Sequence, residues 1–443
     1  MLSLLGFAMV LVFMILIMTR RMSPMVALIG VPILFGIVAG FGGKELGAMM
    51  LEGIRTLAPT GVMLLFAILY FAVMIDAGLF DPVVTRILRA VGNDPLKVVV
   101  GTAVLAGFVS LDGDGSTTYM ITVASLLPLY QRLGMDPLKL TCVTMLASGV
   151  MNLTPWGGPL ARAASALQVD PADVFIGMLP AMAVGLVGVA VIAGVLGLQE
   201  RRRLGHVELA PATPDPARIA DTALLPSPAD AELRRPRLLW FNAILTIALM
   251  ALLVLQLLPM PVLFMAGLAV ALTVNYPKLE DQRRRIADHA KNVLAVVSLI
   301  FAAGVFTGVL SGTGMVMAMS NSFLSAVPDG WGGFLAPITA LASMPFTYFI
   351  SNDAFYFGVL PIVAEAAAAH GADPVELARA SLVGQPIHLL SPLVPSTYLL
   401  VGLAGVDFGD HQRFTLKWAF AVCLAIFAGA LLSNAFPLLA APG

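Results

Sequence analysis

Apolar segments long enough to cross a lipid bilayer recur along the whole 443-residue chain. A transmembrane helix needs about 20 mostly apolar residues, and scanning for such segments predicts spans near residues 4–18, 24–41, 57–75, 137–168, 174–198, 238–258, 260–276, 292–311, 374–405 and 414–438. Only 12% of the residues are charged, whereas soluble domains carry about 25%. That is too little charge to cover a water-facing surface, so we expect an all-α polytopic membrane protein.

The first apolar segment is predicted to be a transmembrane helix and not a secretory signal, because Arg20 and Arg21 follow it and no small-residue cleavage site stands out. The formal net charge of −1 gives no indication of nucleic-acid binding. Cys142 and Cys423 lie in apolar helical segments, where a thiol usually packs as a small apolar group. We expect a lipid bilayer, and no nucleic acid, among the partners of this chain.

Two further apolar stretches, 96–130 and 332–369, are interrupted in the middle by polar and small residues. The interruptions read SLDGDGSTTY at 110–119 and TYFISNDAFY at 347–356. Each arm has about 13 to 19 residues, which is short for a full crossing. Each stretch is therefore predicted to be a re-entrant hairpin whose polar tip lies inside the protein.

Residues 199–237 are charged, rich in Pro and Ala and without helical periodicity, which is typical of a linker. If this linker is cytoplasmic, most of the 25 lysines and arginines fall on the cytoplasmic side, and the opposite loops hold only Lys44, Arg55 and Arg379. Such an excess is what the positive-inside rule requires. The distribution predicts a cytoplasmic linker and both termini outside.

The two halves of the chain carry matching short segments. GMDPLKL at 134–140 recurs as GADPVEL at 371–377, LTP at 153–155 matches LSP at 390–392, Val169-Asp170 matches Val406-Asp407, and the tips align GST at 115–117 with SND at 351–353. About five spans and one hairpin in each half, joined by one linker, give the halves opposite orientations. We therefore predict two inverted-topology repeats, 1–198 and 238–443, as found in secondary transporters.

The first tip carries two carboxylates and several hydroxyls where hydrocarbon is expected. A charge at the bilayer centre costs at least about 2.5–3.5 kcal/mol, so such residues normally face a cavity, a partner or an ion. The alternatives are an ordinary Asp/Gly turn and a calcium loop, and the calcium loop lacks the acid expected near its twelfth position. The candidate binding residues in this tip are Asp112, Asp114, Gly115, Ser116 and Thr117.

The second tip, Ser351-Asn352-Asp353, occupies the equivalent place in the other half. Its alternative interpretation is a helix N-cap. The two interpretations are compatible, because a helix start whose N–H groups point at an anion is itself a binding site.

Two predicted spans, 137–168 and 374–405, are broken at corresponding positions by proline and glycine. Proline removes a backbone donor and clashes with the preceding turn, so each span is expected to contain a short unwound segment. The alternative is a pair of structural kinks. The candidate substrate-binding residues are Asn152, Thr154, Pro155, Gly157 and Gly158 in the first break and Ser391, Pro392, Ser396 and Thr397 in the second.

Tips and breaks together offer groups for anions and for cations, because half-helix N-termini favour the former and carboxylates the latter. Asp112, Asp114 and Asp353 are hard oxygen ligands suited to Mg²⁺ or Ca²⁺, and they are equally candidates for carrying protons. His388 is either a group that titrates during transport or a hydrogen-bonded packing residue. Arg162 either pairs with a substrate carboxylate or extends its charge toward the outer interface.

At these residues the chain resembles the citrate-metal:proton symporter family, CitMHS, within the ion transporter superfamily that includes the divalent anion:sodium symporters. The resemblance rests on SLDGDGSTTY at 110–119, NLTPWGGPLARAA at 152–164, FISNDAFYFGVLP at 349–361 and SPLVPSTYLLVG at 391–402. In related sodium-coupled carriers Ser-Asn-Thr tips hold substrate and cation, whereas the second tip here ends in Asp353. This departure adds a carboxylate, which fits a bound metal ion or proton coupling and argues against transferring the sodium sites of those carriers to this chain.

The resemblance implies proton-driven uptake of citrate complexed with a divalent metal ion across a bacterial cytoplasmic membrane, by a homodimer with a mobile transport domain. The metal is then a co-substrate, and no prosthetic group is expected. The alternative in the same class is a proton- or sodium-coupled carrier of a dicarboxylate, gluconate or metal-free tricarboxylate. Neither a channel nor an intramembrane enzyme is favoured, because polarity is concentrated at four points and no HExxH motif or partner for Ser116 is found.

Overall fold

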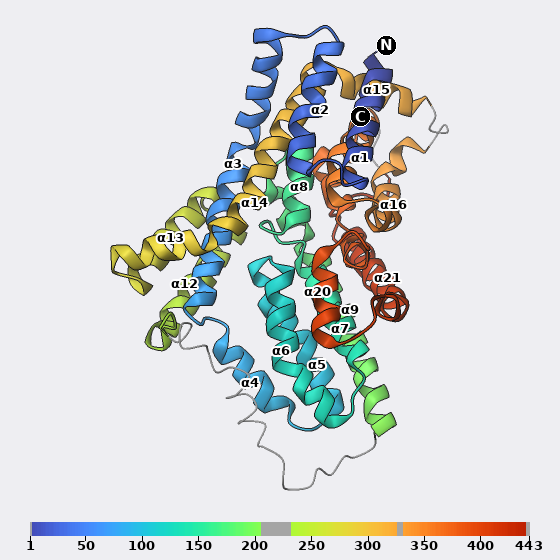
Figure 1. Ribbon diagram of the computed structural model, residues 1–443. Coiled ribbons are helices and arrows are strands. Elements are labelled where there is room, and N and C mark those ends of the chain that lie inside the picture. The colour runs from blue at the N-terminus through green and yellow to red at the C-terminus, as the bar shows by residue number, and fades with distance from the viewer. Residues whose placement is uncertain (1, 205–231, 326–330, 440–443) are drawn as a thin grey trace.

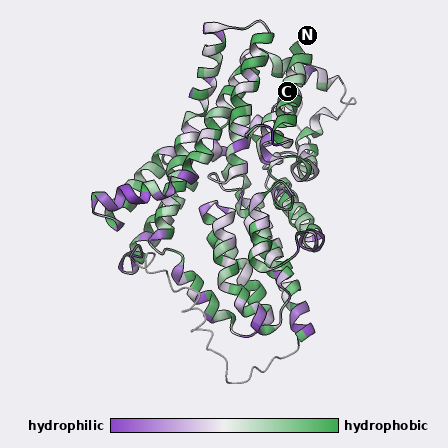
Figure 2. Ribbon diagram, in the orientation of Figure 1, coloured by the Kyte–Doolittle hydropathy of each residue, from purple (hydrophilic) through white to green (hydrophobic). Residues whose placement is uncertain are grey.

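The computed structural model describes residues 2–204, 232–325 and 331–439, and this part of the chain contains helices and no strand. Six of these helices are long and apolar enough to cross a membrane: Gly43–Asp76, Pro95–Asp112, Pro171–Leu204, Pro236–Val254, Leu279–Gly312 and Phe408–Leu432. Shorter apolar helices accompany them. The expectation of an all-α membrane protein is confirmed, and hydrophilic residues gather mainly at helix ends (Figure 2).

The helices follow one another in a similar order in the two halves of the chain (Figure 1). The first half contains α1 (Leu2–Met18), α2 (Pro24–Val38), α3 (Gly43–Asp76), α4 (Asp81–Val91), α5 (Pro95–Val109), the 3-10 turn η1 (Ser110–Asp112), α6 (Gly115–Leu133), α7 (Pro137–Met151), α8 (Gly158–Leu167) and α9 (Pro171–Leu204).

The second half contains α12 (Leu239–Val254), α13 (Met260–Asn275), α14 (Leu279–Gly312), α15 (Met315–Leu324), α16 (Leu335–Phe349), the π-helix η4 (Ala354–Val359), α17 (Leu360–Ala368), α18 (Pro374–Ser381), α19 (Gln385–His388), α20 (Pro395–Ala404) and α21 (Phe408–Leu432). In each half, two helices precede a long helix, a short helix, a hairpin, a broken helix and a final helix. Opposite orientation of the halves stays a prediction.

Several boundaries differ from those predicted. Helices α3 and α14 each have 34 residues and extend well before the apolar cores predicted at 57–75 and 292–311. Helices α4 and α15 lie outside the predicted spans. Helix α4 was missed because it is amphipathic: it buries only Val84, Leu88 and Val91 on one face, and a scan for continuous apolar segments overlooks such a helix.

The linker was predicted at 199–237, but α9 continues to Leu204 and α12 begins at Leu239. Residues 205–231 of the linker lie outside the described residues. At its end, the Arg234 side chain forms an ion pair with Asp81 of 2.7 Å, and the Arg235 backbone N–H donates to Ala77 O. The end of the linker is thereby attached to the connection between α3 and α4.

The Asp-Pro pair that occurs in both halves caps a helix in each of them. Asp136 Oδ1 accepts from Leu138 N at 2.9 Å before α7, and Asp373 Oδ1 accepts from Val375 N at 2.8 Å before α18. A carboxylate at this position satisfies an N–H group that has no partner within the helix. The repeated Asp-Pro pair therefore fixes where each broken helix starts.

Helix packing divides most of the chain into two groups (Figure 1). Helices α2, α3, α12, α13 and α14 form what we call the long-helix group, in which α3 packs along α14 and α13. Helices α5 to α9 and α16 to α21 form the hairpin group, in which α9 packs against α5 and α21. Helix α8 contacts both α3 and α14, so it joins the two groups.

Helices α3 and α14 cross at glycines. A Cβ atom built at Gly53 would lie 2.0 Å from Gly304 O and 2.8 Å from the Cα of Gly308. Backbone atoms cannot move aside as a flexible side chain can, so no larger residue fits at Gly53 without separating the helices.

We predict that Gly53→Ala destabilises the protein by about 1–3 kcal/mol, because the added methyl group overpacks this crossing. The matched control is Gly47→Ala in the same helix, where a Cβ would meet nothing within 4 Å. The melting temperature in detergent should fall for the first variant and stay level or rise for the second. An unchanged melting temperature for Gly53→Ala would contradict the close crossing.

Candidate functional site

The first hairpin tip is held by its own two carboxylates. Asp112 Oδ1 accepts from Asp114 N at 2.9 Å, and Asp114 Oδ1 accepts from Ser116 N at 3.0 Å. Asp114 Oδ2 also accepts from the Thr117 hydroxyl at 2.7 Å. Asp114 is therefore the N-cap of α6, as in the alternative interpretation of this tip as an Asp/Gly turn. Its side chain is exposed, whereas Asp112 is buried.

Trp156 from the first break lies against this tip. Its indole N–H donates to Leu111 O at 2.8 Å. A Cβ built at Gly113, whose φ is +77°, would lie 2.8 Å from Trp156 Cδ1. Only glycine allows both this backbone angle and this approach. Trp156 was not among the predicted site residues, although it lies inside the break segment. Its indole N–H, a donor that needs an acceptor when buried, was the feature that could have indicated it.

An aromatic cluster surrounds Trp156 and connects the two helix groups. The ring centroid of Trp156 lies 5.0 Å from that of Phe71, 5.3 Å from that of Phe264 and 6.4 Å from that of Phe175. Phe71 and Phe264 belong to the long-helix group, while Phe175 belongs to the hairpin group. The first break thus contacts both groups through one side chain.

In the first break, α7 ends at Met151 and α8 begins at Gly158. Gly157 N donates to Thr154 O at 2.9 Å, and a Cβ at Gly157 would lie 2.4 Å from Asn152 O. The segment is therefore a tight turn that excludes a side chain at this glycine. Among the described residues, the buried Thr154 hydroxyl has no hydrogen-bond partner. An unpaired buried hydroxyl is costly unless a ligand or water satisfies it.

In the second break, the backbone is not helical between α19 and α20, and two predicted hydroxyls are used inside it. Ser391 Oγ accepts from Leu393 N at 3.2 Å, and the Thr397 hydroxyl donates to Leu389 O. Both side chains are fully buried, while Pro392 is exposed. In this structure Ser391 and Thr397 hold the broken segment together.

The second tip forms an ion pair with the broken helix of the first half. Asp353 Oδ1 lies 2.6 Å from Nε of Arg162 on α8, and the two residues are 191 positions apart in sequence. Their side chains are 13% and 22% exposed. Ser351 Oγ accepts from Ala354 N at 3.2 Å, as an N-cap does. The buried Oδ1 atom of Asn352 has no hydrogen-bond partner within the described chain.

The first tip lies beside the broken helix of the second half. A Cβ built at Gly115 would lie 3.7 Å from Ser396 Oγ and 3.9 Å from Ser148 Oγ. Helices α6 and α20 pack together, and their N-termini meet at this point (Figure 1). Ser148 was not predicted, because nothing in its apolar sequence context distinguishes it. Each tip therefore contacts the broken helix of the opposite half.

His388 holds two elements of the second half together. Its Nδ1 atom lies 2.7 Å from Thr347 O, and the side chain is buried. The hydrogen bond joins α19 to α16. This geometry is that of a packing histidine, and a proton-coupling role for His388 stays a prediction.

The three predicted metal ligands do not form one cluster. Asp112 and Asp114 bind amides of the first tip, whereas Asp353 pairs with Arg162 in the second. In the ranges that the structure describes, no group of three His, Cys, Asp or Glu side chains is arranged to hold a metal ion.

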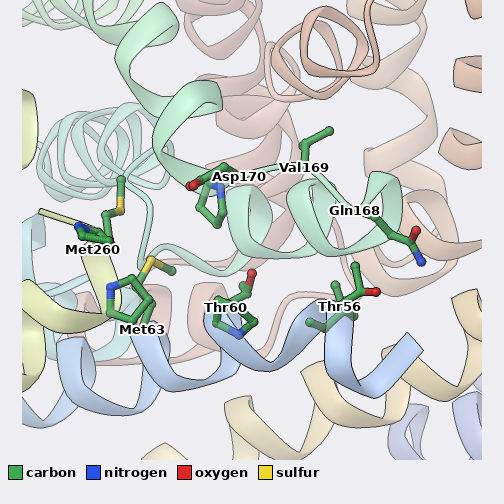
Figure 3. A pocket seen from close by; sticks show the side chains of 12 residues that line it. Thr56, Thr60, Met63, Gln168, Val169, Asp170 and Met260 are labelled. Atoms are coloured by element: carbon green, nitrogen blue, oxygen red, sulfur yellow. The ribbon is translucent and has the colours of Figure 1, made fainter. Parts of the chain in front are cut away.

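A cavity of about 250 Å³ lies where the two helix groups meet (Figure 3). Thr56, Thr60 and Met63 of α3 form one wall, and the connection from α8 to α9, with Gln168, faces them. Met260 at the start of α13 completes the lining. A relative movement of the two groups would change this cavity.

Comparison with known proteins identifies close relatives. A family model described as citrate transporter, CitMHS, matches residues 9–384. A citrate transporter from Bacillus subtilis (strain 168) is 58% identical over 98% of this chain and 99% of its own length. The Mg(2+)/citrate complex secondary transporter of the same organism is 54% identical over 98% and 99%.

Two solved structures share the fold. MtrF of Neisseria gonorrhoeae, which represents a class of antimetabolite efflux pumps, aligns with a TM-score of 0.64 at 12% identity, covering 96% of this chain and 94% of its own. The YdaH transporter of Alcanivorax borkumensis aligns with a TM-score of 0.57 at 15% identity, covering 89% and 90%. At such identities the likeness concerns the fold alone.

We predict that Trp156→Phe lowers stability by about 1–3 kcal/mol, because Leu111 O loses its donor inside the protein. Trp418→Phe is the matched control, since the indole nitrogen of Trp418 has no acceptor in the described residues. The melting temperatures of both variants in detergent test the difference. Equal losses would mean that the bond to Leu111 contributes nothing.

Proposed function

The chain belongs to the CitMHS family of citrate transporters, and from this premise we propose that it takes up citrate complexed with a divalent metal ion by secondary transport. The observation that carries the proposal is the 54% identity, over 98% of the chain, to a Mg(2+)/citrate complex secondary transporter. The family consists of transporters, so the protein is not an enzyme. It is a multi-pass membrane protein.

We propose that substrate binds where tips and breaks meet. Two observations support this location: the unpaired buried Thr154 hydroxyl and the unpaired buried Asn352 Oδ1 belong to two of the four elements. Buried polar atoms are normally satisfied, so both are suited to a polar ligand. At the contact between the first tip and α20 lie Gly115, Ser116 and Ser396.

The N-termini of α6, α8 and α20 differ in whether a side chain caps them. Helix α6 is capped by the Asp114 carboxylate, whereas α8 and α20 begin without a capping side chain in the described structure. An uncapped N-terminus carries partial positive charge and attracts anions. We therefore assign the citrate carboxylates to the starts of α8 and α20, including Gly157, Gly158 and Ser396. The candidates for the one carboxylate that contacts the metal are Asp112, Asp114 and Asp353.

Magnesium and calcium are hard cations that take six or more oxygen ligands. Citrate supplies several of them, so a single protein carboxylate and water complete the shell. This chemistry agrees with the separated aspartates described above. Proton coupling through Asp112, Asp114, Asp353 or His388 is part of the proposal.

We further propose that the hairpin group moves as a rigid body against the long-helix group, as an elevator. The proposal includes inverted repeats at 1–198 and 238–443, a bacterial cytoplasmic membrane location with both termini outside, and a homodimer. Two features support movement between the groups: the cavity at their junction and their contact through α8.

The metal requirement can be tested in vesicles loaded with the purified protein. We predict that Mg²⁺ allows uptake of labelled citrate and that EDTA abolishes it, because citrate without metal carries too much negative charge for the site. Competition by dicarboxylates and gluconate tests the alternative substrates. Citrate uptake that is unchanged by EDTA would overturn the proposal.

Relative movement of the groups can be tested by cross-linking across the cavity. We predict that a bismaleimide bridge between Thr60→Cys and Gln168→Cys, which lie on opposite walls (Figure 3), blocks uptake. The control pair is Thr60→Cys with Met260→Cys, which lies within the long-helix group and should leave uptake intact. The native Cys142 and Cys423 are fully buried and should not react. Equal uptake by both bridged pairs would contradict an elevator movement.

A further inference from the structure

We propose that the ion pair between Arg162 and Asp353 selects the metal–citrate complex over either component alone, by exchanging its two charges for those of the substrate. When the pair opens, the guanidinium binds a citrate carboxylate and the Asp353 carboxylate binds the metal. The inference rests on the proposed function and deepens it, since it explains why the complex and not its components is the substrate.

Arg162 keeps N–H donors that the ion pair does not use. Arg162 uses only its Nε–H on Asp353, and its terminal amino groups have no acceptor in the described part of the chain. A guanidinium has five N–H donors in a planar fork that matches a carboxylate. Its Nη1 atom lies over the start of α8, 2.6 Å from the position of a Cβ at Gly158. Glycine at this position makes room for the guanidinium beside an uncapped helix N-terminus.

The anionic side also has a second ligand. Asn352, the neighbour of Asp353, has a buried side-chain oxygen without a partner among the described residues. Carboxylate and amide oxygens are both ligands of Mg²⁺ and Ca²⁺. The second tip therefore carries an amide oxygen and a carboxylate on consecutive residues, and α8 carries donors for an anion.

Charge balance makes the two halves of the substrate interdependent. The side chains of the pair are 13% and 22% exposed, so neither charge is well solvated when its partner is lost. Free citrate would engage Arg162 but leave Asp353 facing further carboxylates. Free Mg²⁺ would engage Asp353 but leave Arg162 beside a cation. Only the complex compensates both charges.

The exchange also links binding to movement. Arg162 lies on the broken helix of the first half, and Asp353 lies on the hairpin tip of the second. In the closed pair the second tip is attached to α8. Loading the complex replaces this direct bond by a bridge through the substrate, so the second tip and α8 stay connected while the hairpin group moves as one body.

Equilibrium binding to purified protein tests the inference with three probes: Mg²⁺ alone, citrate in EDTA, and citrate with excess Mg²⁺. We expect Asp353→Asn to shift the preference at least about tenfold toward free citrate, because the guanidinium is then unpaired. We expect Arg162→Gln to shift the preference by a similar factor toward free Mg²⁺. The matched control is Asp81→Asn, which removes the Arg234 ion pair outside the site and should leave all ratios unchanged.

The opposite directions of the two changes in preference distinguish an ion pair that selects the substrate from one that only stabilises the fold. A pair that merely stabilised the fold would weaken the binding of all three probes alike, and that result would overturn the inference. If one variant fails to fold, as judged by its melting temperature, the other still gives its own sign. If wild-type protein shows no preference for the complex, the proposed function itself fails. If wild-type protein prefers the complex and both variants keep the same preference, the proposed function stands and only the ion-pair exchange fails.

Discussion

Backbone polar groups inside a bilayer must find partners within the protein, and the arrangement of this chain depends on that constraint. A continuous helix satisfies them by itself, so each interruption needs a neighbouring element. Leu111 O receives the indole N–H of Trp156, and Leu390 O receives the side-chain amide of Gln412 at 2.7 Å. The interruptions are therefore packed against other elements of the protein, which supply the missing hydrogen-bond partners.

The interruptions contact each other across the two halves. The first tip lies beside α20, and the second tip is paired to α8 through Arg162. Each tip therefore has a contact with the opposite half, so the proposed site combines residues of both halves. The proposed substrate carries both signs of charge, which agrees with a helix start that has free N–H donors and a tip that has side-chain oxygens.

Much of this organisation follows from local sequence. Asp136 and Asp373 precede proline and cap their helices in the structure, as the repeated Asp-Pro segments indicate. The tips and breaks were found because proline, glycine and aspartate are rare in apolar segments. Helix α4 was missed because its periodicity is amphipathic, and Ser148 was missed because a serine in an apolar helix has no distinguishing neighbour.

By itself, the sequence determined the membrane environment, the helical class and the positions at which helices are interrupted, because these depend on hydropathy and on the backbone chemistry of proline and glycine. Only the tertiary structure decided the roles of the polar residues. In the folded chain Asp114 caps α6, Thr397 forms a hydrogen bond within the second break, and Asp353 pairs with Arg162. The reason is that hydrogen bonds and ion pairs join atoms brought together by packing, and a separation of 191 residues carries no local signal.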